Sequence, residues 1–269
     1  MAKRWTQDEL LVALGLYCQL PFGQFHRRQP LIIQAAKSLQ RTPDSLAMKL
    51  SNLASLDPKI TGTGRKGLPG ASELDRQMWQ TFTSDTSTLM PLAEQALASA
   101  LDTETTKEPE EPPSYQESDH FARTKVRKGQ QLFRAAVLSA YNNSCCITGL
   151  SDDRFLIASH IRPWRIDIQN RLNPSNGLCL SLMFDKAFDS GLITFSDDYR
   201  LLLSNELRDQ QHNAYMAATF FAHQGAVLQL PSKFSPDAAL LRIPANVTGH
   251  SGDRDRFAHG LHAGTGFVL

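Results

Sequence analysis

A histidine, an asparagine and two aspartates form the set of residues that could carry out hydrolysis. His160 ends a largely apolar segment, and Asn176 precedes a glycine in a turn-rich stretch. Asp185 and Asp189 follow, four residues apart. Imidazole can take a proton from water near neutral pH, and carboxylate oxygens are the ligands that Mg²⁺ and Mn²⁺ prefer. A base and a hard cation are together what hydrolysis of a phosphodiester needs.

The elements expected around these residues are two strands and a helix. Residues 154–160 alternate loosely and favour a strand, which ends before Pro163 because proline cannot continue a ladder. The turn-rich residues 173–177 then lead into a short apolar run at 178–180, which predicts a second strand. Residues 182–189 predict a helix capped by Ser181. The order is therefore strand, loop, strand and helix.

The predicted helix has a carboxylate face and an apolar face. Residues four apart lie on the same side of a helix, so Asp185 and Asp189 share one face. Phe184 and Phe188 share a neighbouring face that can pack into the core. A hairpin of residues 192–195 and 199–203 should follow the helix, which Gly191 ends.

Four stretches of this region carry a family resemblance. They are Cys-Ile-Thr-Gly at 146–149, Ala-Ser-His-Ile-Arg-Pro-Trp at 158–164, Asn-Gly-Leu-Cys-Leu at 176–180, and Phe-Asp-Lys-Ala-Phe-Asp-Ser-Gly-Leu-Ile at 184–193. Together they resemble the HNH (ββα-metal) endonuclease family over roughly residues 128–205. The resemblance implies a phosphodiester hydrolase that acts on DNA with a divalent metal, Mg²⁺ or Mn²⁺. Residues 5–58 also resemble the leader module of bacterial HNH restriction endonucleases.

The resemblance assigns a role to each matching residue. His160 matches the base that deprotonates the attacking water, and Asn176 matches the asparagine whose amide ties the loop backbone together. Asp185 stands where the family has its final histidine, a metal ligand on the helix. Ser159 stands where many members have Asp or His as a second ligand. Asp189 or a main-chain carbonyl could supply the coordination that a serine hydroxyl supplies poorly.

Two arginines just past the base are candidate substrate contacts. Arg162 and Arg165 could grip adjacent phosphates through charge-assisted hydrogen bonds. The alternative is that both belong to a solvated loop without a role in binding.

Composition is that of an ordinary globular protein. The chain has 269 residues, 41% of them hydrophobic and 20% charged, and no apolar run approaches a membrane span. Its N-terminus lacks the apolar stretch of an export signal. Four irregularly spaced cysteines do not form a disulfide framework, and Cys145-Cys146 lacks the partner CxxC of a zinc site. We therefore expect a cytoplasmic protein without a membrane partner.

Charge divides the chain into modules. The net charge is +1 overall, but it is +4 over residues 1–85, −7 over 86–122 and +4 over 123–205. A Pro/Glu-rich run at 108–114 favours an extended linker. We therefore predict an α+β protein with a helical N-terminal domain at 1–101 and an acidic linker at 102–122. An HNH nuclease domain with a C-terminal extension at 123–243 and an irregular tail at 244–269 follow.

The first module should be mostly helical. Thr6 can cap a first helix that Pro21 to Gly23 breaks, a second helix spans roughly 30–39, and Thr42-Pro43 starts a third. Helix, turn and helix resemble a helix-turn-helix, in which Arg41 and Lys49 could contact a DNA groove or phosphates. The alternative is a helical bundle whose polar residues are solvated.

The leading hypothesis is a restriction or anti-phage defence nuclease that cuts double-stranded DNA. A second hypothesis is a catalytically weak or inactive DNA-binding subunit of a defence complex, because Ser159 weakens the metal site. A nuclease that acts on RNA or single strands is a third. Cleavage of both strands with one active site per chain would require a homodimer or sequential nicks.

Overall fold

The computed structural model describes residues 4–62, 70–102, 129–236 and 267–268. It divides into two compact units, Met1–Ala140 and Tyr141–Leu269. The first unit is helical, and the second combines helices with two small sheets, so the chain is α+β. Nearly all of the predicted linker at 102–122 and of the predicted tail at 244–269 lies outside the described residues.

The first unit is a bundle of helices around α1. Its helices are α1 (Gln7–Gln19), α2 (Pro30–Ser38), α3 (Pro43–Ala54), α4 (Pro58–Gly62), α5 (Glu73–Ser84), α6 (Thr86–Ala100) and α8 (Gln130–Ala140), with a 3₁₀ turn at Phe22–Gln24. α1 packs against α3, α6 and α8. Gly15 allows the close approach of α6, since a Cβ there would lie 2.9 Å from the carbonyl oxygen of Ala93.

Capping residues start these helices. Thr6 and Glu9 form a capping box at α1: the Glu9 N–H donates to Thr6 Oγ1, and the Thr6 N–H donates to Glu9 Oε2. Thr42 caps α3 with Pro43 in the first helical turn. Both satisfy backbone donors that the first turn of a helix leaves without an intrahelical partner. These starts agree with those expected from the sequence.

Helix α8 packs within the first unit. Glu94 on α6 accepts hydrogen bonds from the N–H groups of Gly129 and Leu132 at the start of α8. Ser139 Oγ donates to the carbonyl of Cys18 at 2.5 Å. The predicted nuclease domain begins at residue 123, which would group α8 with that domain and not with the helical bundle. The apolar face of a helix shows that it packs but not on which neighbour, so periodicity does not fix this border.

The second unit holds short strands joined by loops and short helices. Its elements are β1 (Leu156–His160), β2 (Gly177–Ser181), α9 (Leu182–Asp189), β3 (Ile193–Phe195), β4 (Leu201–Ser204), α10 (Ala214–Thr219) and β5 (Phe267–Val268), with 3₁₀ turns at Asp153–Phe155, Pro174–Asn176, Asn205–Gln210 and Phe221–His223. Strands β1 and β2 form an antiparallel pair, and the second sheet has the order β3-β4-β5.

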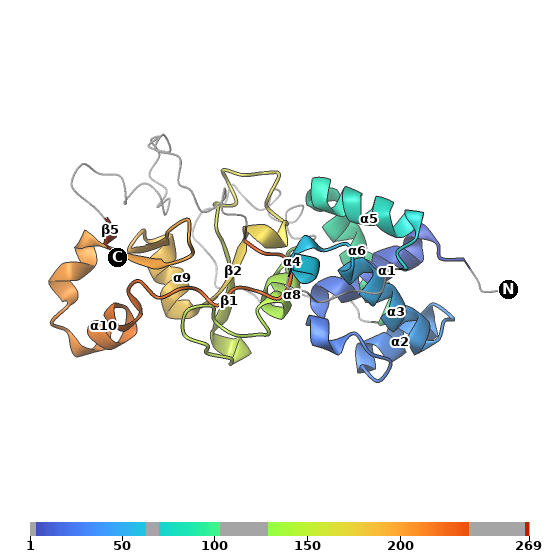
Figure 1. Ribbon diagram of the computed structural model, residues 1–269, viewed down its shortest axis with the longest axis horizontal. Coiled ribbons are helices and arrows are strands. Elements are labelled where there is room, and N and C mark those ends of the chain that lie inside the picture. Colours follow the sequence, from blue (N-terminus) through green and yellow to red (C-terminus); the bar gives the residue numbers. More distant parts are fainter. Residues whose placement is uncertain (1–3, 63–69, 103–128, 237–266, 269) are drawn as a thin grey trace, which may run out of the picture. The chain divides into compact units, whose positions relative to one another are not determined.

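Helix α9 lies against the β1-β2 pair (Figure 1), with contacts to both strands. Its apolar face is buried as expected: Phe184 packs edge-on against Phe220 at 5.2 Å between ring centroids, and Phe188 packs against Phe195 at 5.3 Å. Strand β2 is buried along its whole length. The strands and the helix therefore form one continuous core. No described helix has the length and apolar character needed to cross a bilayer.

Candidate active site

His160 is the last residue of β1, paired with Gly177 of β2. Its side chain is half-buried, and Nε2 lies 2.9 Å from the carbonyl oxygen of Arg171. A carbonyl only accepts hydrogen bonds, so this contact places a proton on Nε2. In the neutral ring the lone pair is then on Nδ1. The contact fixes both the orientation of the ring and the nitrogen that can act as a base.

Asn176 joins the end of β1 to the loop that follows it. It is completely buried. Its Oδ1 accepts from the N–H of Arg162 at 2.8 Å, and its Nδ2 donates to the carbonyls of Arg162 at 3.3 Å and Asn170 at 3.1 Å. Its own carbonyl accepts from the N–H of Ile161. All three polar contacts of the amide therefore go to backbone groups of the loop.

The rest of the loop is tied by further polar contacts. Asp167 accepts hydrogen bonds from the backbone N–H and the side-chain amide of Asn170. Asn173 donates to Asn170 Oδ1 and caps the 3₁₀ turn through the N–H of Ser175. The loop that carries the Arg171 carbonyl is therefore held from several points along its length.

Asp185 and Asp189 lie on α9, both half-buried, while their neighbours Phe184 and Phe188 are in the core. The helix thus offers two carboxylates on a face that differs from its apolar face, and it packs on the strand that ends in His160. The strand that ends in His160 and the helix that carries the two carboxylates are therefore packed on each other.

Ser159 lies on the other face of β1, because successive side chains of a strand point to opposite faces. It is 2% exposed, and its hydroxyl makes no hydrogen bond to any described residue. It is paired with Leu178, in the fully buried part of β2. Ser159 and His160 are therefore not presented together on one face.

Within the described residues, no group of three or more His, Cys, Asp or Glu side chains is arranged to hold a metal ion. Such a group is typical of structural zinc and calcium sites. Mg²⁺ instead keeps several waters and is often bound by one or two carboxylates plus substrate phosphates. The half-buried carboxylates of α9 fit this second mode and not a closed cage.

Arg162 and Arg165 differ in their surroundings. Arg162 Nη1 lies 3.6 Å from Asp167 Oδ2, and the arginine side chain is 33% exposed. Arg165 is exposed on the loop next to the base. Arg162 is therefore held within the loop by an ion pair, whereas Arg165 is on the surface.

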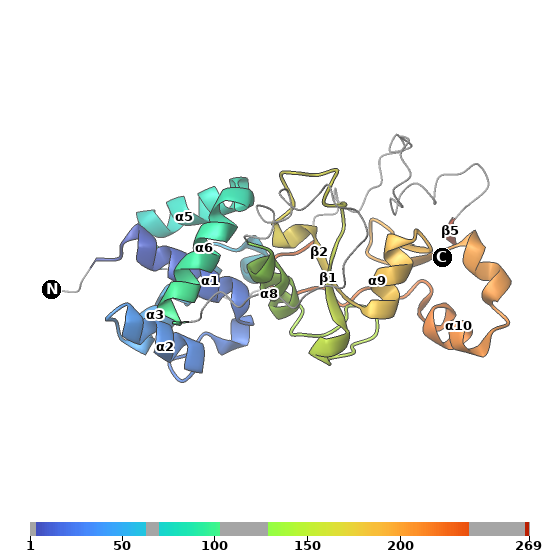
Figure 2. The ribbon, with the colours of Figure 1, turned by 180° about the vertical axis from the view of Figure 1, so that it is seen from behind.

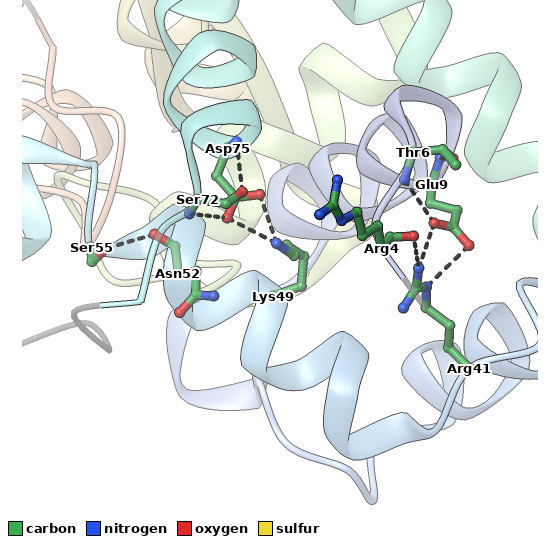
Figure 3. Close-up of polar contacts among 9 residues, drawn as sticks. All are labelled: Arg4, Thr6, Glu9, Arg41, Lys49, Asn52, Ser55, Ser72 and Asp75. Atoms are coloured by element: carbon green, nitrogen blue, oxygen red, sulfur yellow. Dashed lines mark hydrogen bonds and ion pairs between the residues drawn. The ribbon is translucent and has the colours of Figure 1, made fainter. Parts of the chain in front are cut away.

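Arg41 and Lys49 are used inside the first unit (Figure 3). Arg41 donates through Nε and Nη2 to the two carboxylate oxygens of Glu9, and the pair is 7% and 8% exposed. Lys49 Nζ lies 2.8 Å from both carboxylate oxygens of Asp75, with 5% and 0% exposed. Both cations also lie over the ring of Trp5. The structure therefore places both side chains in buried ion pairs and not in a position that faces a DNA groove.

Three cysteines line the core near the β1-β2 pair. Cys145 Sγ accepts from the N–H of Ser181, and the N–H of Cys146 donates to the carbonyl of Cys179. All are buried thiols. Burial raises the pKa of the Cys146 thiol well above its ordinary value, and the neighbouring Cys145 and Cys179 raise it further. Cys146 therefore stays protonated, as expected of a small core residue.

The ββα arrangement and its histidine define a small nuclease-like module. Residues 145–196, from Cys145 through β1, β2 and α9 to the turn after β3, match the family model of HNH endonucleases. The HNH resemblance predicted from the sequence is confirmed over this segment, and the match supports a nuclease activity in general. No curated protein matches the chain.

Two features of the site were not predicted from the sequence. The Arg171 carbonyl that holds His160 has no sequence signature, because every residue carries a carbonyl. The Trp164 ring meets His160 edge-on at 5.5 Å between centroids. An aromatic residue four positions after a candidate base was the available signal.

Proposed function

We propose that the chain is a metal-dependent endonuclease that hydrolyses DNA phosphodiester bonds, with His160 as the general base. The observation that carries the proposal is the hydrogen bond between His160 and the Arg171 carbonyl, in a loop held by Asn176. A base must be held in one orientation and one tautomer to take a proton efficiently. The HNH match over the same residues supports this use of the histidine.

In this mechanism His160 Nδ1 takes a proton from the attacking water. Asn176 maintains the position of the strand end, and exposed Arg165 contacts a neighbouring phosphate, with Arg162 beside it. Asp185 would hold Mg²⁺ or Mn²⁺, with Asp189 as the second candidate ligand. Such an ion, when bound, supplies charge stabilisation to the phosphate and the leaving oxygen. Ser159, buried on the opposite face of β1, is the weakest candidate ligand.

The biological role that we propose is restriction or anti-phage defence in the cytoplasm. In this role the helical first unit supplies recognition or sensing, and cleavage of both strands comes from a homodimer or from sequential nicks. The basic balance of residues 1–85, which is +4, supports a nucleic-acid partner.

The test is cleavage of supercoiled plasmid by the full chain with Mg²⁺ or Mn²⁺. We expect nicked product with the native protein, and a rate lower by roughly 10²–10⁴ with His160→Ala, the range that a positioned base contributes. His212→Ala is a matched control, because His212 is an exposed histidine outside the site. Equal cutting by native protein and His160→Ala would overturn the assignment.

A DNA-binding subunit without hydrolysis is the second candidate, favoured by the buried position of Ser159 where the family often has a ligand. Salt-sensitive DNA binding without cleavage in either metal would support this candidate. Single-stranded DNA and RNA of the same sequence, assayed in parallel, separate the remaining substrate classes.

A further inference from the structure

The side chain of Arg171 folds back onto the residue that touches the histidine ring. Arg171 Nε donates to the carbonyl of Trp164 at 2.6 Å. Its guanidinium carbon lies 5.2 Å from the centroid of the Trp164 ring. A guanidinium at this distance from an indole face is attracted by the ring quadrupole. One side chain is thus fixed by a hydrogen bond and by a cation–π contact with the same tryptophan.

His160, Arg171 and Trp164 each contact the other two. Its Nε2 is held by the Arg171 carbonyl, and its edge-on neighbour at 5.5 Å is Trp164. Arg171 and Trp164 are bound to each other across the loop. Displacement of the Arg171 side chain would therefore remove contacts that help to hold both the carbonyl and the indole against the ring.

We infer that Arg171 is a positioning residue, which acts on the proposed base through its own main-chain carbonyl and through Trp164. The inference rests on the proposed function, because it concerns the residue proposed as the base. It assigns to Arg171 the selection of the Nε2–H tautomer of His160, which leaves the lone pair on Nδ1. Arg171 itself contacts neither water nor phosphate in this role.

The chemistry of the contact requires arginine in particular. Nε is a donor within the planar guanidinium, so that it can bind the Trp164 carbonyl while the same plane lies near the indole. Lysine has one terminal ammonium and no donor at this point of the chain. Methionine has a similar stem with neither the donor nor the charge.

The direct test is a nitrogen-15 spectrum of the imidazole groups in the full chain, with His160→Gln used to assign the His160 signals. The native protein should show His160 as the Nε2–H tautomer. Arg171→Met and Arg171→Lys should both give a mixture of tautomers. This measurement needs no nuclease activity, so it decides the positioning role even where the chain cleaves nothing.

Kinetics provide the second readout. We expect Arg171→Met to lower kcat roughly tenfold, as is common for residues that orient a reacting group, with little change in KM. Trp164→Phe keeps an aromatic ring and the carbonyl, so it should retain most of the activity, whereas Trp164→Ala should lose it. Arg154→Met is the matched control, since Arg154 pairs with Asp152 and lies over the Phe155 ring, outside the site, and its side chain is 82% exposed.

A native tautomer signal in Arg171→Met would overturn the inference. If Arg171→Met fails to fold, Trp164→Phe and Trp164→Ala decide. We then expect a mixture of tautomers in Trp164→Ala and the native tautomer in Trp164→Phe. The same result in both variants would contradict the inference. If the native chain cleaves no nucleic acid while Arg171→Met alters the tautomer, the proposed function fails and the positioning role stands.

Discussion

Buried polar residues of the two units differ in the partners that they bind. In the first unit Arg41 and Lys49 are buried against carboxylates, and both ends of each ion pair are almost inaccessible (Figure 3). In the second unit Asn176, one of several buried polar residues there, has backbone groups as partners. Figure 2 shows the helical bundle and the ββα elements from behind, each compact in itself.

The difference separates a structural use of polar groups from a functional one. An ion pair between two buried side chains satisfies both charges and leaves neither available for a ligand. A side chain that binds the backbone fixes a loop, and the loop can then present other groups. In the second unit those other groups are His160 and exposed Arg165. The partner of a polar residue, more than its type, indicates its role.

The largest effect should come from breaking a buried ion pair. Lys49→Met leaves the Asp75 carboxylate buried, at 0% exposure, without its cation. Breaking such a pair by removing one partner costs about 3–5 kcal/mol. We expect the free energy of unfolding of the first unit to fall by this amount in urea titrations, with hydrogen exchange assigning the loss to residues of that unit.

The control for Lys49→Met is Arg27→Met. Arg27 and Asp44 are 3.8 Å apart and both are 63% exposed, so their contact should contribute nothing measurable. Equal losses in the two variants would contradict the distinction between buried and exposed pairs.

The next largest effect is expected at Asn176. Asn176→Ala leaves the Arg162 N–H without its acceptor and two carbonyls without their donor. We expect a loss of about 2–3 kcal/mol, measured by urea unfolding of the second unit, together with slower plasmid cleavage. Asn213→Ala, which removes the cap of α10, should cost about 1 kcal/mol and leave cleavage unchanged.

Alkaline pH should lower the free energy of unfolding of both units, because each contains a buried tyrosine. Burial raises the pKa of Tyr17 in the first unit and of Tyr141 in the second, in both cases well above the ordinary 10.0. Above that value the unfolded chain loses protons that the folded chain keeps. The free energy of unfolding therefore falls as pH rises, by about 1.4 kcal/mol per pH unit for each such group.

Two phenylalanine variants separate these contributions. Tyr17→Phe should flatten the alkaline decline of the first unit but lose the 2.9 Å hydrogen bond to Asp57. Tyr141→Phe should flatten that of the second unit and cost nothing near pH 7, because its buried hydroxyl makes no hydrogen bond to the described residues. Unfolding between pH 8 and 11 is the measurement, and an unchanged slope in both variants would refute this origin.

Local patterns in the sequence predicted the elements and the order of the site. Thr42-Pro43 predicted the start of α3. On α9, the four-residue spacing predicted one face with Asp185 and Asp189 and another with Phe184 and Phe188. Both depend on neighbours along the chain. The alternation that places Ser159 and His160 on opposite faces of β1 is equally local.

Contacts between distant residues could not be predicted in this way. Lys49 and Asp75 are 26 positions apart, and nothing in either residue type indicates the other as its partner. The Arg171 carbonyl and the side of α8 that packs on α1 are likewise set by tertiary structure. Arg41 and Lys49 were expected to face DNA because of their charge and their position in the predicted helix-turn-helix. Neither property reveals whether a side chain is buried.

The smallest expected effect is on DNA affinity, and it tests the comparison most directly. Arg165→Gln removes an exposed charge next to His160, so DNA binding should weaken at every salt concentration in metal-free buffer. The slope of log affinity against log salt should fall by about 0.9, the value for one phosphate contact. Unfolding should change little, because the Arg165 side chain is exposed. Arg41→Gln should lower the free energy of unfolding, because it leaves Glu9 buried without its partner. It should leave the salt slope of DNA binding unchanged, because no phosphate contact is lost. If Arg41→Gln instead lowered the salt slope and left unfolding unchanged, Arg41 would face DNA after all, and the buried ion pair would not describe the bound protein.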